Sequence, residues 1–319
     1  MIISITRYVK SIVLMILIMS PFSLVKAAEY HLISEVGTSA RQIALGHLEG
    51  FSQASNSIFE NPAGLYRTSK ISISAFSVRL MDEVKYSNIA LSSRFLNGHI
   101  AAGFMQVAID NIPETACPAE DDSACRNLVT FPVVKNWFDY NNSVYKLAYQ
   151  WSVLEDIEVA ASVVYYRQSY YKISGAGSNI DLGFIYRFND KLEASLLLRN
   201  VIPGQSIHYN QGDPEPLPVQ HVLSLRQSLK WGIDIYPQIK WFHYQWLPSI
   251  GIMYKPNFFP YVHFMSGYKA ALDVTQKRHN RIAFGIGLQL MSITINYAYE
   301  RTDYILNQHK HYASITANF

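Results

Sequence analysis

The sequence contains two cysteines, Cys117 and Cys125, in a polar stretch that also holds Pro118, Glu120 and Asp121. A zinc site needs four ligands such as thiolate or imidazole, and no plausible third and fourth ligand lies nearby. A disulfide is the alternative chemistry, and it forms in the oxidising compartments that receive exported chains. Because the N-terminus described below predicts export, we predict a Cys117–Cys125 disulfide and no metal site.

Motifs for nucleophilic or metal-assisted catalysis are missing from the sequence. It has neither a Gly-x-Ser-x-Gly elbow nor a His-Glu-x-x-His helix. His309 and His311 share one strand face, but no nucleophile is expected within their reach. The Gly175-Ala-Gly177 stretch is too short and isolated to bind a nucleotide, and a turn is the simpler interpretation. We therefore expect no enzyme activity, no catalytic residues and no cofactor.

The N-terminus has the three parts of a secretory signal. Arg7 and Lys10 form a basic region, residues 12–19 form an apolar run, and Val25-Lys26-Ala27 is a small-x-small cleavage site. An N-terminal membrane anchor is the alternative, but Pro21 and Lys26 end the run short of the ~20 residues that a spanning helix needs. We predict a signal peptide over residues 1–27 and export of the remainder.

The exported part is uncharged overall and rich in aromatic residues. The full chain of 319 residues has 27 basic and 24 acidic residues, 49% hydrophobic residues, 13% aromatic residues and only 16% charged residues. Removal of Arg7, Lys10 and Lys26 with the signal leaves 24 basic against 24 acidic residues, so the net charge is zero. Nucleic-acid binding requires a clustered basic face, and we therefore expect no nucleic-acid partner.

Apolar and polar residues alternate along most of the chain, as in strands with two different faces. In one segment Ile180, Leu182 and Phe184 alternate with Asp181 and Gly183. The pattern predicts fourteen strands of about ten residues, near 70–80, 84–95, 98–110, 140–152, 157–172, 179–188, 191–201, 219–228, 230–241, 247–255, 259–268, 280–290, 291–300 and 309–319. Tilted strands of about this length cross the roughly 25 Å apolar band of an outer-membrane barrel.

The connections between the predicted strands alternate in length. Tight turns are expected at Asn97-Gly98, 154–156, Asn189-Asp190 and Pro256-Asn257, and longer links at 111–139, 173–178, 202–218, 269–279 and 301–308. Transmembrane barrels have short periplasmic turns and long outer loops. A secreted β-sandwich is the alternative, but its strands are usually shorter and more irregular. We predict an all-β transmembrane antiparallel barrel over residues 70–319, located in the outer membrane of a Gram-negative-type bacterium and contacting lipid and lipopolysaccharide.

Residues 28–69 do not alternate and are expected to form a separate N-terminal segment. Ala40, Ile43, Ala44, Leu48 and Phe51 have helical spacing, and Asn61-Pro62-Ala63-Gly64 is typical of a turn. Eight strands enclose an interior that side chains fill, whereas 16 to 18 leave an aqueous channel. A barrel of fourteen strands has room for a plug, and we assign residues 28–69 to a short helical plug.

Several stretches resemble one family. Residues 37–46 and Asn61-Pro-Ala-Gly-Leu65 are similar to the N-terminal signature of the PorV/PorQ branch of FadL-like outer-membrane proteins, although this chain has Gly46-His47 where that branch has two glycines. Later blocks occur in the order of the family, at 196–201, Leu217-Pro218, 266–268 and 296–299, with His311 and Phe319 at the end. The resemblance spans essentially the whole exported chain.

The resemblance implies a 14-stranded barrel with its N-terminal segment inside as a hatch formed by Asn61, Pro62, Ala63 and Gly64. FadL-like members pass hydrophobic molecules across the outer membrane by diffusion, and PorV-like members act in type IX secretion. The implied function is passive transport of hydrophobic small molecules, and the alternative is a component of a secretion system or a structural barrel. Phe319 resembles the terminal aromatic that the outer-membrane barrel assembly machinery recognises.

Strand faces give two further sets of candidates. Four apolar residues interrupt the polar inward face and are candidates for substrate contact, namely Phe76, Phe104, Val164 and Tyr166. Aromatic residues on the apolar face are expected to form girdles against lipid rather than a ligand pocket, and they are Tyr149, Trp151, Tyr186, Trp231, Tyr254, Tyr297 and Tyr299. Inward charges such as Lys146, Asp181, Glu193, Arg199 and Arg281 are expected to pair with one another or with the plug rather than line a polar path.

Overall fold

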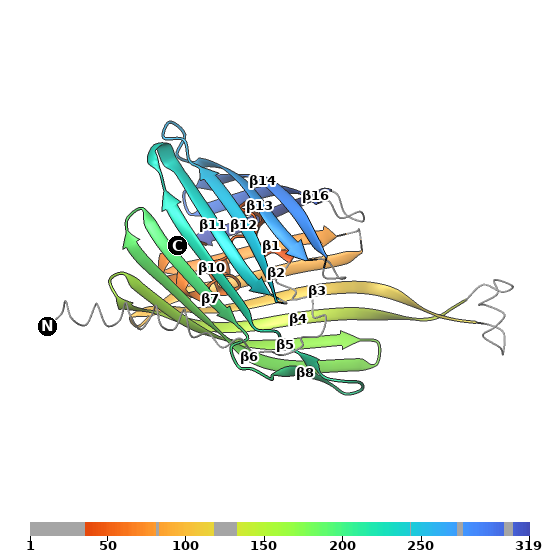
Figure 1. The fold of residues 1–319 in the computed structure, drawn as a ribbon. Helices are drawn as coiled ribbons and strands as arrows, with labels where there is room; N and C mark the ends of the chain where they lie inside the picture. The colour runs from red at the N-terminus through yellow and green to blue at the C-terminus, as the bar shows by residue number, and fades with distance from the viewer. Residues whose placement is uncertain (1–35, 81–82, 118–132, 243, 273–276, 303–308) are drawn as a thin grey trace.

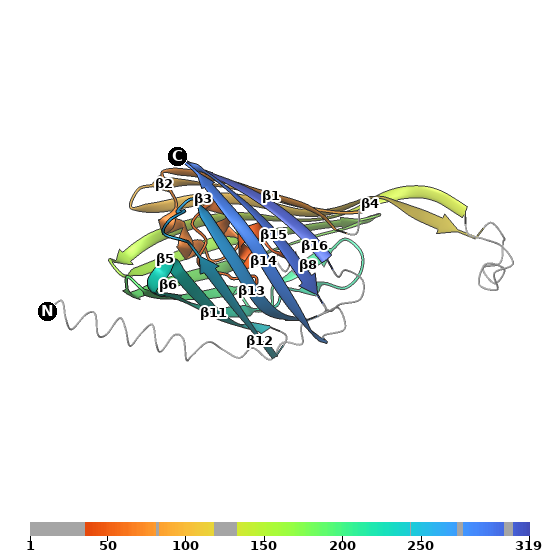
Figure 2. The ribbon, with the colours of Figure 1, turned by 90° about the horizontal axis from the view of Figure 1, so that it is seen from above.

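The structure is a computed structural model that describes residues 36–80, 83–117, 133–242, 244–272, 277–302 and 309–319. The signal peptide predicted for residues 1–27 and the first part of the predicted plug lie outside the described residues. Most of the described chain is one antiparallel sheet that closes on itself (Figures 1 and 2).

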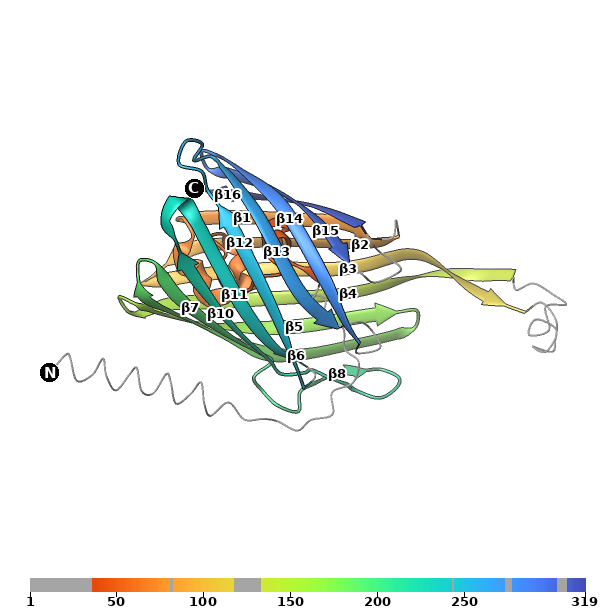
Figure 3. The ribbon, with the colours of Figure 1, turned by 45° about the horizontal axis from the view of Figure 1, so that its top comes forward.

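Fourteen long strands form the wall of the barrel, which is the predicted fold class. They are β1 (Ile71–Leu80), β2 (Val84–Phe95), β3 (Gly98–Ala116), β4 (Val133–Leu154), β5 (Ile157–Tyr170), β6 (Ile173–Asn189), β7 (Leu192–Arg199), β10 (Gln220–Ser228), β11 (Ile233–Phe242), β12 (Gln245–Tyr254), β13 (Val262–Leu272), β14 (Arg278–Leu290), β15 (Ile293–Thr302) and β16 (His309–Asn318). Two short strands, β8 (Ser206–Tyr209) and β9 (Glu215–Pro216), pair with each other in the link between β7 and β10, and β8 extends the edge of β6 (Figure 3).

The first and last strands close the barrel. Residues 72–77 of β1 pair with residues 313–318 of β16, and the Phe319 amide donates to the Ile71 carbonyl at 2.8 Å. Neighbouring strands are otherwise consecutive in the chain, except that β7 pairs with β10 across the β8–β9 hairpin. Closure pairs β1 with β16 and so removes the open sheet edge that a lipid environment does not tolerate.

The two faces of the wall differ as the alternation predicts. On the outward face Ile89, Leu147 and Val163 expose 52%, 56% and 57% of their surface. On the inward face of the same strands Ala90, Ala148 and Val164 are buried. An apolar surface around a closed sheet is the surface that such a barrel presents to lipid. No helix within the described residues is long and apolar enough to cross a membrane.

Three predicted strand and loop boundaries are wrong. β3 and β4 remain paired as far as Ala116 and Val133, past a register shift at residues 109–112, so residues 111–116 and 133–139 of the predicted link 111–139 are strand. These ends project beyond the wall (Figures 1 and 2). Pro113 is tolerated there because β2 stops pairing with β3 at Ala108, which leaves β3 with a free edge.

The other two errors concern turns. The predicted link 173–178 belongs to β6, because Tyr171 with φ 52° closes a tight turn between Tyr170 and Ile173. Trp231 lies in a turn and not in a strand, because its own φ is 64° and that of Gly232 is 76°. Both turns therefore contain a non-glycine residue, Tyr171 or Trp231, at a positive φ angle, and these residue types do not predict such a turn.

Residues 37–69 form a compact segment inside the barrel, which we call the plug (Figures 1 and 3). It contains the helix α2 (Ala40–Ala44) and the 3-10 helices η2 (Ser55–Ile58) and η3 (Pro62–Arg67). Ser39 caps α2 by accepting from the Gln42 amide, and Asn61 caps η3 by accepting from the Ala63 amide. Pro62 occupies the first turn of η3, where the missing N–H costs nothing.

Candidate functional site: the plugged lumen

Small residues on the inward face of the wall make room for the plug. A Cβ on Gly183 would collide with the Asn61 side chain, and one on Gly103 would meet the Phe59 ring. Gly46, at φ 72°, packs directly against the backbone of β13, where Gly267 lies opposite it. The barrel is therefore fitted to the plug at the level of individual glycines.

Asn61 is the residue of the predicted hatch element whose side chain forms hydrogen bonds to the wall. Its side chain is fully buried and lies against β6 and β7. The Asn61 Nδ2 donates to Ser195 Oγ at 2.8 Å and to the Leu196 carbonyl at 3.1 Å, while its Oδ1 accepts from the Ala63 amide at 3.0 Å. Pro62, Ala63 and Gly64 follow it in η3 and are buried too. The Asn-Pro-Ala-Gly sequence thus joins the plug to the wall.

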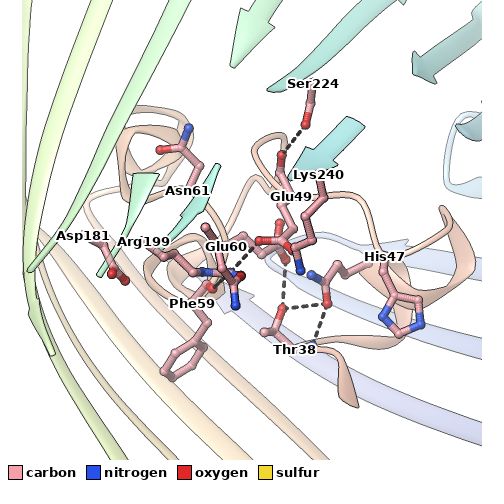
Figure 4. A network of polar contacts seen from close by, with 12 residues as sticks. Thr38, His47, Glu49, Phe59, Glu60, Asn61, Asp181, Arg199, Ser224 and Lys240 are labelled. Carbon is pink, nitrogen blue, oxygen red and sulfur yellow. Dashed lines mark hydrogen bonds and ion pairs between the residues drawn. The ribbon is translucent and has the colours of Figure 1, made fainter. Parts of the chain in front are cut away.

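A buried ionic cluster holds the middle of the plug (Figure 4). Glu49 lies 2.5 Å from Arg199 Nη2 of β7 and 3.1 Å from Lys240 Nζ of β11. Arg199 Nη2 also donates to the Phe59 carbonyl at 2.8 Å. The Glu49 amide donates to Gln238 Oε1 at 2.7 Å, and its carbonyl accepts from Ser224 Oγ at 2.9 Å. Glu49 therefore joins the plug to three neighbouring strands, to β7 and β11 through its carboxylate and to β10 through its backbone carbonyl.

A second polar contact between the plug and the wall involves His47, which stands where the family that the sequence resembles has a glycine. His47 has a φ of 56°, a conformation that glycine adopts most easily. Its Nε2 lies 2.9 Å from Glu300 Oε2 of β15. Burial, with the nearby Lys269 charge, lowers the pKa of His47 to about 4, so at neutral pH the neutral ring donates a hydrogen bond to the carboxylate. This bond offsets part of the backbone strain at His47.

Glu60 is a buried carboxyl group within the plug itself. Its Oε1 accepts from Asn56 Nδ2 at 2.8 Å and from Thr38 Oγ1 at 3.1 Å (Figure 4). Its Oε2 is buried and has no hydrogen-bond partner among the described residues. Burial raises the pKa of Glu60 to about 8. The plug therefore contains a carboxyl group that is protonated at neutral pH.

The inward face of the wall carries buried aromatic and aliphatic side chains from the middle of β1 toward the end opposite the short turns. Phe76 packs edge-on against Tyr86, with ring centroids 5.6 Å apart, and stacks with Tyr312 at 6.1 Å. Val78 and Leu80 of β1 pack against this cluster, and Ile207 and Leu217 join it from the link between β7 and β10. The same cluster includes plug side chains such as Phe51 and Phe59, so these wall residues and the plug form one apolar interior.

Three of the four predicted lumen residues lie on the inward face of the wall, and the fourth does not. Phe76, Val164 and Tyr166 are buried on the inward face, where the Tyr166 hydroxyl donates to Asn200 Oδ1 at 2.9 Å. Phe104 does not face the lumen as predicted, because its ring packs on Tyr145 of the outward face, with centroids 5.0 Å apart. The inward positions of β3 are occupied by Ala101, Gly103 and Met105, which places Phe104 on the opposite face.

The inward charges pair as expected. Lys146 lies 2.6 Å from Asp181, Arg281 lies 3.5 Å from Glu300, and Glu193 pairs with Arg67 of the plug. Six of the seven predicted outward aromatic residues lie on the outward face of their strands, where Trp151, Tyr254 and Tyr297 are exposed. The seventh, Trp231, is exposed too but lies in the turn before β11. Cys117 is disulfide-bonded, while its predicted partner Cys125 lies outside the described residues. The Phe319 ring is 64% exposed.

The sequence did not predict which residues form the ion pairs between the plug and the wall. Arg199 is predicted only as an inward charge, and neither Glu49 nor Lys240 is predicted at all. Glu49 lies 150 positions before Arg199 and 191 before Lys240, and no periodicity relates it to them. The run of Gly, Ala and Ser at inward positions is the signal that could have located the plug, because small residues mark where another backbone approaches.

The sequence matches no family model and no curated protein. Solved structures with a similar fold include the toluene transporter TodX of Pseudomonas putida, with 12% identity and a TM-score of 0.62, covering 89% of this chain and 98% of that one. The toluene transporter TbuX of Ralstonia pickettii has 11% identity and a TM-score of 0.59, with coverages of 89% and 98%. A FadL homologue of Pseudomonas aeruginosa has 11% identity and a TM-score of 0.57, with coverages of 88% and 98%.

These likenesses concern the fold. They cover nearly nine tenths of this chain. The closed sheet, the apolar outward face and the internal plug agree with them. The protein is an outer-membrane β-barrel with a FadL-like fold.

Proposed function

We propose that this barrel passes hydrophobic small molecules across the outer membrane by passive diffusion, and that the plug acts as its hatch. The observation that carries the proposal is the apolar interior of the barrel, in which Phe76, Tyr86 and Tyr312 of the wall form one buried cluster with the plug. The similar solved structures named as toluene transporters support the same class of solute.

The physical argument starts from the membrane. Lipopolysaccharide is a poor path for apolar solutes, because its outer layer is charged and hydrated. A water-filled pore does not help, since an apolar solute gains nothing on leaving the bulk. A solute that enters a lumen lined by aromatic side chains removes its apolar surface from water, and this transfer is favourable by roughly 25 cal/mol per Å². Such a solute therefore enters the lumen spontaneously and accumulates above the plug.

The plug must then move to open a path through the barrel. Its contacts with the wall include hydrogen bonds and ion pairs through Asn61, Glu49 and His47, and its apolar side chains, such as Phe51 and Phe59, are buried in one hydrophobic cluster with the wall. Polar contacts exchange readily for water when a segment shifts, whereas buried apolar contacts resist the shift. Opening of the hatch therefore requires the plug to break both kinds of contact while the strands of the wall stay paired.

An uptake assay tests the proposal. Gram-negative cells that lack their own hydrophobic channel would express the full chain or a chain without residues 61–64, and uptake of a labelled monoaromatic hydrocarbon would be timed. Expression of the full chain should raise the initial rate several-fold over empty cells, and the deletion should change that rate. An equal rate with and without the protein, at matched amounts of folded barrel, would refute the proposal.

A role in a secretion assembly is the second candidate. The paired ends of β3 and β4 extend beyond the wall and expose Val133, Val134 and Trp137, which is a surface for a protein partner rather than for a solute. The resemblance to the PorV/PorQ branch favours the same role. Co-purification of a large secretion complex with the intact chain, lost in Trp137→Ala, would support it. Recovery of the barrel alone under the same extraction would count against it.

A further inference from the structure

A cavity of about 320 Å³ lies between the plug and the wall, at the barrel end that carries the short turns. The plug contributes Arg41 and Arg67, β10 contributes Arg226, and Lys255 follows β12. No aspartate or glutamate lines this cavity among the described residues. Four cationic side chains therefore converge on one confined space.

Nearby carboxylates neutralise only half of this charge. Glu193 pairs with Arg67 and lies 3.6 Å from Arg226, and Asp234 lies 3.5 Å from Arg226. Within the described part of the chain, neither Arg41 nor Lys255 has a carboxylate within ion-pair distance. Two positive charges thus remain unbalanced beside the cavity.

The two unbalanced charges, on Arg41 and Lys255, are energetically unfavourable because both side chains are partly buried. Arg41 and Lys255 are only half-exposed, and burial together with the Arg41 charge lowers the pKa of Lys255. Like charges in a confined space destabilise each other unless an anion joins them. Arg226 supplies a further donor, because its Nε is buried and finds no acceptor among the described residues.

The remaining lining selects for a polar ligand. Most of the other side chains are neutral hydrogen-bonding groups, such as Asn56, Gln289 and Thr294, while apolar contact comes from Ala54 and Met253. A neutral hydrocarbon would leave these groups and the cations unpaired. Guanidinium groups bind carboxylates and phosphates through paired, charge-assisted hydrogen bonds.

We propose that this cavity binds a small oxyanion, a carboxylate or phosphate group, between Arg41 of the plug and Lys255 of the wall. Such an anion joins the plug to the wall across the face opposite the apolar lumen. It has two possible sources, a free anion in the solution at that end or the headgroup of an amphiphile. The binding does not depend on the transport proposed above.

Calorimetric titration of the detergent-purified full chain at low ionic strength tests the site, with inorganic phosphate, acetate and octanoate as probes. At least one probe should bind the unmodified protein. The double variant Arg41→Gln/Lys255→Gln should weaken its binding at least about tenfold, since it removes both charged hydrogen-bond donors between which the anion is proposed to lie. Lys230→Gln is the matched control, because Lys230 is an exposed cation at the same end and outside the cavity, and it should leave binding unchanged.

The comparison of probes identifies the source. Octanoate binding more tightly than acetate indicates the headgroup of an amphiphile, and equal affinities indicate a free anion. Heat-modifiability on gels would show that the variants remain folded barrels. The proposal is overturned if none of the three probes binds, or if the folded double variant binds as tightly as the unmodified protein. Neither result bears on hydrocarbon uptake, which is measured separately.

Discussion

The Asn61 side chain occupies the space that a Cβ on Gly183 would need. Asn61 belongs to the plug and Gly183 to the middle of β6, and the two are held together by the bonds from Asn61 to the adjacent β7. The plug and the wall are therefore complementary in shape at one residue pair, and the pair can be tested genetically.

Gly183→Ala should destabilise the seated plug by about 1–3 kcal/mol, the usual cost of one extra carbon in a packed site. The change should appear as a lower melting temperature of the barrel in detergent. Asn61→Ala provides the control, because it removes the atom that the new methyl group meets. In the Asn61→Ala background Gly183→Ala should cost less than in the native chain, and equal costs would show that the two residues do not act on each other.

A crosslink between the plug and the wall should block uptake if the plug is a hatch. Ser55 Oγ of η2 lies 2.9 Å from Ser74 Oγ of β1, and both residues are buried. Ser55→Cys/Ser74→Cys should form a disulfide at this distance and reduce hydrocarbon uptake to the level of cells without the protein. Reductant should restore uptake. Ser55→Cys alone and the native chain, each measured with and without reductant, control for the thiol and for the native disulfide. Full uptake through the oxidised double variant would show that the solute does not need plug movement.

Glu49→Gln should be among the more destabilising substitutions in the plug. It leaves Arg199 and Lys240 close together and buried without their shared carboxylate, and removal of one partner from a buried ion pair costs roughly 3–5 kcal/mol. Lys85→Gln is the comparison, since Lys85 and Asp110 form an exposed pair, and such pairs contribute about 0–1 kcal/mol. Thermal unfolding of both variants in one detergent would measure the difference. Similar melting temperatures would mean that the cluster does not hold the plug.

Glu60 should make the barrel less stable as the pH rises. Its pKa is raised from 4.5 to about 8 in the folded chain, so the folded state binds a proton that the unfolded state has released. This contribution to stability is complete below pH 4.5, declines between pH 4.5 and about 8, and is lost above that. Glu60→Gln, which resembles the protonated acid, should raise the melting temperature at pH 9 and change it little at pH 5. A stabilisation that is equal at both pH values would contradict this assignment.

The sequence by itself determined the wall of the barrel. A period of two in segments such as 179–188 specifies a strand with one apolar face, and repetition of this pattern across fourteen segments leaves a closed antiparallel sheet as the consistent solution. Residues 28–69 lack that period, and the sequence therefore predicts a separate segment before the wall. These features are local, since each depends on residues within about ten positions of one another.

The tertiary structure alone decided which residues meet across the lumen. Glu49 finds Arg199 and Lys240, and His47 finds Glu300, through contacts that join distant parts of the chain. The inward or outward face of Phe104 also depended on the register of β3, because a shift of one residue reverses every side chain of a strand. Burial inside the closed barrel gives these contacts their strength, and burial is a property of the assembled sheet rather than of any segment.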